Sequence, residues 1–239
     1  MKRRPPAKEK PLGMRIGESV FCAGYLSFAL VAGIVFTLRA GDSTAAATGA
    51  LAATCAAMTF LLGAGDAFHL VPRIMVNLQG AARNARERRS RQLWLGLGNL
   101  VSSITMTIFY ILLFDAMAQT PAAQAGSAPQ LVRTLLIVLA VVRIALCLFP
   151  QNRWFDGEGS RTWGIYRNLP FVAMGLVTVG YLIVCYRTWL IAELVTASFA
   201  CYMGVVLYAH EKPMMGMLMI PKTICYIWMI ALFLMMTAA

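Results

Sequence analysis

The chain has 239 residues, of which 59% are hydrophobic and only 13% are charged. A soluble domain carries about 25% charged residues, so the composition excludes an ordinary soluble protein and predicts an integral membrane protein. The net charge of +11 is compatible with a nucleic-acid ligand, but the basic residues gather between apolar segments, which argues against nucleic acid.

Apolar segments follow one another along nearly the whole chain, each near the 20 or so residues that a helix needs to cross a bilayer. We place them at 19–38, 44–75, 93–118, 131–149, 169–186, 189–209 and 213–236. The sequence therefore predicts an all-α polytopic membrane protein with seven transmembrane helices. Residues 1–18 form a basic cytoplasmic tail in this prediction, and 19–239 form a single transmembrane domain.

Lysines and arginines flank these segments unevenly. Sixteen lie in the N-terminal tail or in loops on the same side of the membrane, against three on the opposite side, namely Arg39, Arg133 and Arg187. Because basic loops stay in the cytoplasm, this pattern predicts a cytoplasmic N-terminus and an external C-terminus in the plasma membrane. The densest basic stretch, Arg83–Arg91, is predicted to contact anionic lipids.

Lys222 is the most informative residue, because it lies about ten residues into the seventh apolar segment. A charge at that depth costs from roughly 2.5 to more than 10 kcal/mol unless it is paired, hydrated or covalently used. Asp66 lies at a similar depth in the second segment, and His69, three residues later, shares its helix face. These three residues predict a polar cluster near the cytoplasmic ends of the helices.

Other polar and aromatic residues fall near the same layer. The predicted ligand-binding set adds Asn99, Ser103, Phe199, Tyr202 and Trp228. An accessory polar set comprises Arg143, Asn168, Tyr208, His210 and Glu211. Although Asp66, His69 and His210 are residue types that bind zinc, the chain has only two histidines, and we predict no metal site.

These residues leave several functions open. A ligand-binding sensor would hold a small molecule in the cluster, whereas a small-solute or proton-coupled transporter would use Asp66, His69 and Lys222 to bind substrate or relay protons. No internal repeat of the kind common in transporters is visible. A membrane-embedded lipid-modifying enzyme and a scaffold with an Asp66–Lys222 ion pair are further alternatives. Hydrolase, Walker and dinucleotide-binding motifs are absent, which favours a non-enzymatic role, and an oligomer is compatible with each reading.

The combination of seven helices, a cytoplasmic N-terminus and a lysine in the seventh helix resembles the heliorhodopsins, a family of retinal proteins with inverted membrane orientation. Residues 67–69 (Ala-Phe-His) resemble the histidine-bearing segment of that family's second helix, and 102–106 (Ser-Ser-Ile-Thr-Met) its serine-rich third helix. Residues 169–171 (Leu-Pro-Phe) and 198–200 (Ser-Phe-Ala) resemble stretches of its fifth and sixth helices. Lys222 and Thr223 resemble the Schiff-base lysine and the serine that follows it.

The resemblance implies an opsin-like sensor with retinal bound to Lys222 as a Schiff base. The family's third-helix glutamate has no equivalent in 97–100 (Leu-Gly-Asn-Leu), and Cys22 stands where the family has a first-helix histidine. Asp66 would therefore act as the counterion, and His69 as the proton acceptor. Phe199, Tyr202 and Trp228 would line the chromophore pocket.

Overall fold

The computed structural model describes residues 11–42, 46–80, 82–120, 123, 129–156, 159–185, 188–208 and 213–238. Its helices are α1 (Leu12–Asp42), α2 (Ala46–Gln79), α3 (Ala85–Ala118), α4 (Pro129–Leu148), α5 (Arg161–Val184), α6 (Trp189–Tyr208) and α7 (Met219–Met236). Short 3-10 helices, η2 (Pro150–Asn152) and η3 (Pro213–Leu218), precede α5 and α7. In the described ranges there is no strand, and seven helices are long and apolar enough to span a membrane, which confirms the predicted all-α fold.

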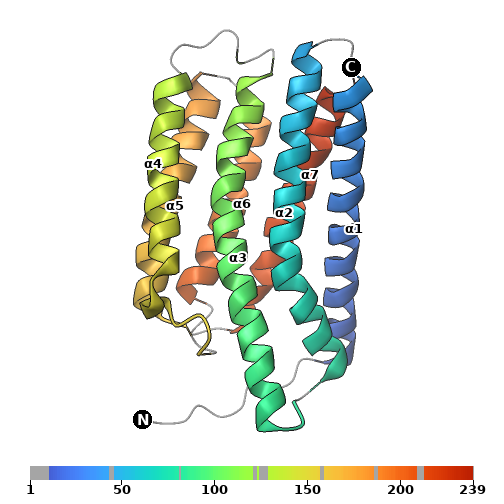
Figure 1. The fold of residues 1–239 in the computed structure, drawn as a ribbon, viewed down its shortest axis with the longest axis vertical. Coiled ribbons are helices and arrows are strands. Elements are labelled where there is room, and N and C mark those ends of the chain that lie inside the picture. The colour runs from blue at the N-terminus through green and yellow to red at the C-terminus, as the bar shows by residue number, and fades with distance from the viewer. Residues whose placement is uncertain are drawn as a thin grey trace.

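The helices run alternately up and down in one bundle, with the start of α1 and the end of α7 at opposite ends (Figure 1). Neighbours along the chain pack against each other from α1 to α7, and α7 closes the ring by packing on α1 and α2. The starts of α1, α3, α5 and α7 and the ends of α2, α4 and α6 share one end of the bundle, called the basic end below. The charge pattern predicts that this end faces the cytoplasm.

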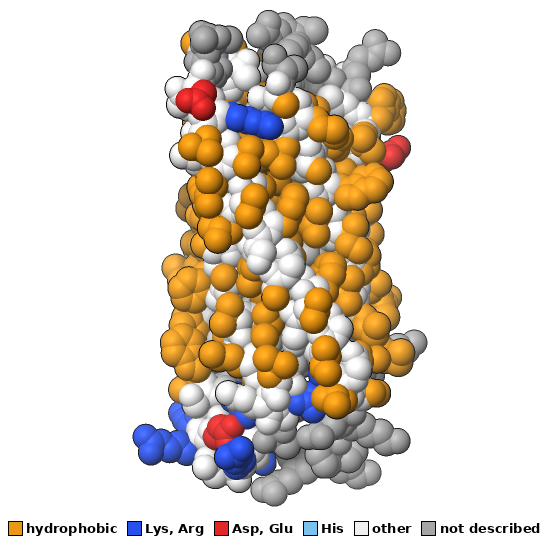
Figure 2. Space-filling view, turned by 90° about the vertical axis from the view of Figure 1, so that its right-hand side faces the viewer, with side chains coloured by type: hydrophobic (Ala, Val, Ile, Leu, Met, Phe, Trp, Pro, Cys, Tyr) orange, Lys and Arg blue, Asp and Glu red, His pale blue; other side chains and the backbone are white. Residues whose placement is uncertain are grey.

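Apolar side chains cover the middle of the bundle's outer surface, and charged side chains gather at its two ends (Figure 2). Large side chains such as Leu131, Leu176 and Val184 are 70–77% exposed. Such a surface is unfavourable in water but matches the hydrocarbon interior of a bilayer. The chain is therefore a multi-pass membrane protein.

Several helices extend beyond the predicted apolar segments, and the longest extensions lie at the basic end. α1, α3 and α5 begin at Leu12, Ala85 and Arg161, where the apolar segments begin at 19, 93 and 169. The apolar pattern marks only the part of a helix that touches lipid, whereas the helix itself continues into the basic interface. In α7 the difference is reversed, because residues 213–218 form η3 and the α-helix starts only at Met219. Pro221 then lies in the first turn of α7, where a missing N–H costs little.

An aromatic cluster fills the centre of the bundle. It consists of Phe109, Tyr110, Phe171, Phe199 and Tyr226 from α3, α5, α6 and α7. The contacting rings have centroids 4.7–5.4 Å apart in edge-on or tilted arrangements, which favour aromatic pairs beyond their burial alone. The polar residues of the basic end lie next to this cluster, on the side nearer that end of the bundle.

Candidate functional site

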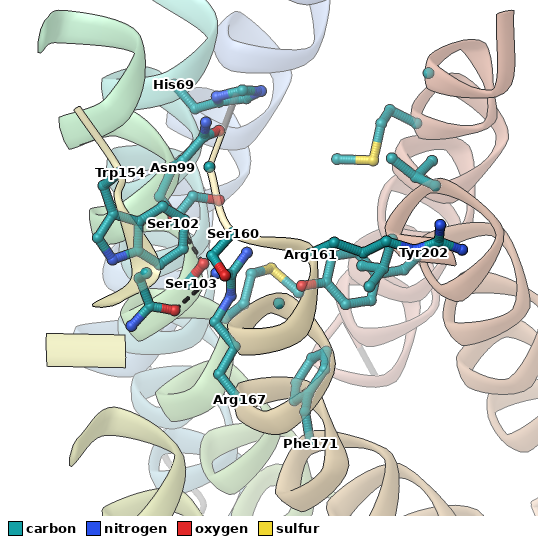
Figure 3. Close-up of a pocket in the computed structure, with 18 of the residues that line it drawn as sticks. His69, Asn99, Ser102, Ser103, Trp154, Ser160, Arg161, Arg167, Phe171 and Tyr202 are labelled. Carbon is teal, nitrogen blue, oxygen red and sulfur yellow. Dashed lines mark hydrogen bonds between the residues drawn. The ribbon is translucent and has the colours of Figure 1, made fainter. Parts of the chain in front are cut away.

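A cavity of about 340 Å³ lies at the basic end, with walls from α2, α3, α4, α5, α6 and α7 and from the segment that joins α4 to α5. Figure 3 shows His69, Asn99, Ser102 and Ser103 on one wall and Tyr202 on the opposite wall. The volume falls within the roughly 300–1,000 Å³ typical of ligand-binding sites. The cavity is therefore large enough for a small solute.

Positive charge dominates this cavity. Its cationic lining residues are Arg73, Arg143, Arg161, Arg167 and Lys222. Among the described residues that line it, none is an aspartate or a glutamate. Arg73 forms an ion pair with Glu18 of α1, outside the lining. The concentration of one sign of charge at a membrane-embedded site is the main electrostatic feature of the protein.

Lys222 projects from the first turns of α7 and is only 5% exposed. Its Nζ lies 5.0 Å from the centre of the Tyr226 ring and 5.6 Å from that of Tyr202, close enough for cation–π attraction. In the part of the chain that the structure describes, no ion pair joins Lys222 to a carboxylate. The faces of two aromatic rings therefore contribute to the surroundings of the ammonium group.

Asp66 is buried as well, but its carboxylate is held by other partners. The Tyr25 hydroxyl of α1 donates to Oδ2 at 2.8 Å, and the Ser102 hydroxyl of α3 donates to Oδ1 at 3.2 Å. The direct Asp66–Lys222 ion pair expected of a purely structural role is not formed. Because Ser102 also lines the cavity, it connects Asp66 to the site through one hydrogen bond.

Arg143 of α4 is almost completely buried, with 1% of its surface exposed. Its guanidinium carbon lies 3.4 Å from the centre of the Phe171 ring, and its Nη1 donates to Thr107 Oγ1 at 2.8 Å. Asn168 Oδ1 accepts from the Tyr202 hydroxyl at 2.8 Å and lies 3.5 Å from Arg143 Nη2. Arg143 Nε is buried without a hydrogen-bond partner among the described residues. The guanidinium is thus fixed in place while its Nε remains without a hydrogen-bond partner.

Arg167 is held by the segment between α4 and α5. Its Nη1 donates to Asn152 Oδ1 at 2.8 Å, and its guanidinium carbon lies 4.0 Å from the centre of the Trp154 ring. Asn152 is fully buried and donates to the carbonyls of Leu146 and Phe149 at 2.7 and 2.9 Å. Arg167 Nε also has no partner in the described part of the chain.

The sequence did not single out Asn152 or Trp154, and it predicted Arg167 to extend to the membrane interface rather than to bind a ligand. The signal that was available is local: polar and aromatic residues at 151–155 stand directly between two apolar segments. Such a loop is easily taken for a simple connection. Its folding back over the cavity depends on the hydrogen bonds of Asn152, which the residue pattern does not reveal.

His69 lines the cavity from α2, and its Nδ1 is buried without a hydrogen-bond partner among the described residues. Asn99 and Ser103 of α3 line the same wall, and the Ser103 hydroxyl donates to the Asn99 carbonyl at 2.7 Å. His69, Asn99, Ser103, Tyr202 and Lys222 are therefore brought together around one space.

The remaining predicted residues lie elsewhere. Asn168 contacts the site through Tyr202, and Phe199 belongs to the aromatic cluster and packs on Phe171 at 4.7 Å. Trp228 and Tyr208 are 58% and 49% exposed, and neither lines the cavity. His210 and Glu211 lie outside the described residues.

Fold and site together define a seven-helix integral membrane protein with a cation-lined cavity at one end. Comparison with protein-family models, with curated proteins and with solved structures finds no match to this chain. The function therefore has to be argued from the site itself.

Proposed function

We propose that this protein is a membrane-embedded sensor that binds a small anionic solute in the cavity at the basic end. The observation that carries the proposal is the lining of the cavity: it includes Arg143, Arg167 and Lys222, which form no ion pair with a carboxylate among the described residues, and no described acidic residue. A solute with carboxylate, phosphate or sulfate groups supplies the missing negative charge. The predicted orientation of the basic end makes this a solute of the cytoplasm.

The energetic argument rests on three of the cations. Arg143, Arg167 and Lys222 form no ion pair with a carboxylate among the described residues. Charges inside a membrane protein are costly unless a partner or water compensates them. An oxyanion in the cavity would reduce this cost, because its negative charge would lie beside the buried cations.

The hydrogen-bonding groups of the cavity support the same conclusion. Arg143 Nε, Arg167 Nε and His69 Nδ1 are buried polar atoms without partners in the described part of the chain. Guanidinium groups match the planar geometry of carboxylates and the oxygens of phosphates, and such charge-assisted bonds are about twice as strong as neutral ones. Stacking on Phe171 and Trp154 holds both guanidinium groups in position before a ligand arrives.

Binding of an oxyanion is expected to stabilise the purified protein. In lipid nanodiscs, inorganic phosphate or succinate at 100 times its Kd should raise the free energy of unfolding by about 2.7 kcal/mol, as measured by thermal unfolding. Arg167→Gln should lose this stabilisation, because it removes one of the three cations that form no ion pair with a carboxylate in the described ranges. Arg153→Gln should keep it, because Arg153 is exposed and pairs with Asp156. Absence of stabilisation by every oxyanion, at constant ionic strength, would refute the proposal.

Sensor and carrier are distinguished by transport. Uptake of labelled phosphate or succinate into proteoliposomes would identify a carrier, the alternative that also uses Asp66, His69 and Lys222. Binding without uptake is the result expected of a sensor.

A retinal-binding sensor is the second candidate, and the observation that favours it is the buried Lys222 with aromatic rings on two sides. Retinal bound there as a Schiff base needs room along the bundle axis. The aromatic cluster occupies the centre of the bundle, so side chains such as Phe171 and Phe199 would have to move. Asp66 would serve as counterion from its position beside Ser102.

Retinal binding has a direct spectroscopic test. Protein expressed with all-trans retinal should show a visible absorption band that borohydride removes and that Lys222→Ala lacks. A colourless protein that is folded, with the helical circular dichroism of seven helices, would exclude this candidate and leave the anion sensor.

A further inference from the structure

A second cavity, of about 600 Å³, lies on the outside of the bundle between α2 and α3 at the basic end. This second cavity shares no lining residue with the cation-lined cavity, which is the proposed anion site. We call it the α2–α3 groove. Its apolar walls include Phe68, Val71 and Met75 of α2 and Trp94 of α3, which are 42–56% exposed.

The groove arises from the way the two helices cross. At Gly98 the helices touch: a methyl group added there would lie 2.4 Å from the carbonyl oxygen of Phe68 and 2.7 Å from the α-carbon of His69. Pro72, one turn further along α2, has no N–H to donate to that carbonyl, and proline bends helices for this reason. Figure 1 shows the lower part of α2 running away from α3 towards α1.

The end of the groove nearest the basic end of the bundle is polar, and its side chains are hydrogen-bonded. Gln79, Glu87, Ser90 and Arg91 line it. Arg91 donates to the Gly80 carbonyl at 2.5 Å and to Gln79 Oε1 at 3.2 Å, and it pairs with Glu87. These bonds tie the two helices together again beyond the groove, so the groove has a closed polar end and an apolar body.

Positive charge continues from this polar end into the basic interface. Arg86 lies one helical turn before Ser90 on the same side of α3, and Arg83 precedes the N-cap residue Asn84. Both are exposed. Glu87 is already engaged by Arg91 and by the backbone N–H of Arg83 at 2.9 Å. The 3.6-residue repeat places Arg89 on the face of α3 that points away from the groove, whereas Arg88 lies about one turn before the lining residue Arg91.

We infer that the α2–α3 groove is a binding site for one anionic phospholipid. One acyl chain lies against Phe68, Val71, Met75 and Trp94, and the phosphate lies at Ser90 with Arg83 and Arg86. The apolar body faces the lipid side of the bundle, where acyl chains are the molecules present at highest concentration. The arginines determine that the headgroup is anionic, because basic residues at the membrane surface attract such lipids.

Trp94 makes the site measurable, since bromine atoms quench tryptophan fluorescence on contact. The full-length protein is placed in nanodiscs of phosphatidylcholine with increasing fractions of phosphatidylglycerol that carries brominated acyl chains. Subtracting the same titration of Trp94→Phe isolates the Trp94 signal. Phosphatidylcholine with the same brominated chains is the reference lipid.

Brominated phosphatidylglycerol is expected to quench Trp94 at a much lower mole fraction than brominated phosphatidylcholine. The double variant R83Q/R86Q should reduce this preference by roughly 30-fold, the effect of two arginines near a membrane surface. The matched single variants are R86Q and R89Q: R86Q should reduce the preference about 5-fold, whereas R89Q removes the same charge from the face of α3 that points away from the groove and should keep most of the preference.

Three outcomes would overturn the inference. Equal quenching by the two lipids would show ordinary boundary lipid. Equal loss in R86Q and R89Q would show attraction to the whole basic segment rather than a built site. Absence of quenching by either lipid would show that something other than an acyl chain fills the groove.

Discussion

Lys222→Met is expected to stabilise the ligand-free protein by about 1–4 kcal/mol and to abolish oxyanion binding. Replacing a buried ion pair by apolar side chains of similar volume often has this effect on stability, and a single buried ammonium group carries the same kind of desolvation cost. The gain in stability should be large for Lys222→Met, because the ammonium group of Lys222 is buried and forms no ion pair with a carboxylate in the described ranges. Methionine keeps the length of the side chain and adapts to its surroundings. Thermal unfolding in nanodiscs, with and without phosphate, measures both effects.

Lys222→Arg is the matched control, because it keeps the charge and should keep the stabilisation by phosphate. A loss of stability in Lys222→Met would contradict the argument, since it would mean that Asp66 compensates Lys222 across the bundle. In that case the double variant D66N/K222M would recover the stability that each single variant loses.

Gly98→Ala is expected to destabilise the protein by about 3 kcal/mol, the upper part of the range for overpacked sites. The added methyl group would lie 2.4 Å from the Phe68 carbonyl oxygen and 2.7 Å from the His69 α-carbon. Both are backbone atoms, so no side-chain rotation can relieve the clash and the helices must separate. Because His69 lines the anion site, phosphate affinity should fall as well. Thermal unfolding and phosphate titration in nanodiscs give the two values.

Gly24→Ala is the control for the substitution itself. A methyl group at Gly24 meets nothing within 4 Å, and α1 continues on both sides of it. Alanine should therefore be neutral or stabilise by up to about 1 kcal/mol through its higher helix propensity. Equal effects of the two substitutions would show that α2 and α3 do not meet at Gly98.

Much of the fold could be predicted from the residues alone. A bilayer requires continuous apolar helices, so the number of helices and their order follow from the apolar segments. The depth of a residue also follows, at 1.5 Å per residue along a helix. Both Asp66 and Lys222 were expected in one layer near the basic end, and both are buried.

The partners of those residues could not be predicted. Asp66 and Lys222 were expected at one depth, which leaves open the groups that each would contact; in the structure the Asp66 carboxylate accepts from Tyr25 of α1 and Ser102 of α3. Trp228 was expected in a ligand pocket but is 58% exposed on α7. Helix rotation depends on how all the neighbouring side chains pack, and the depth of a residue says nothing about that rotation.

By itself, therefore, the sequence determined the class of protein, the order of its helices and the depth of its polar residues, because each follows from one helix and the bilayer. Only the tertiary structure decided that Arg143, Arg167 and Lys222 surround one cavity without a described acidic residue in its lining. That arrangement depends on helix crossings such as Gly98 on Phe68 and on the segment held by Asn152. These are contacts between residues far apart in the chain, which local composition and periodicity do not encode.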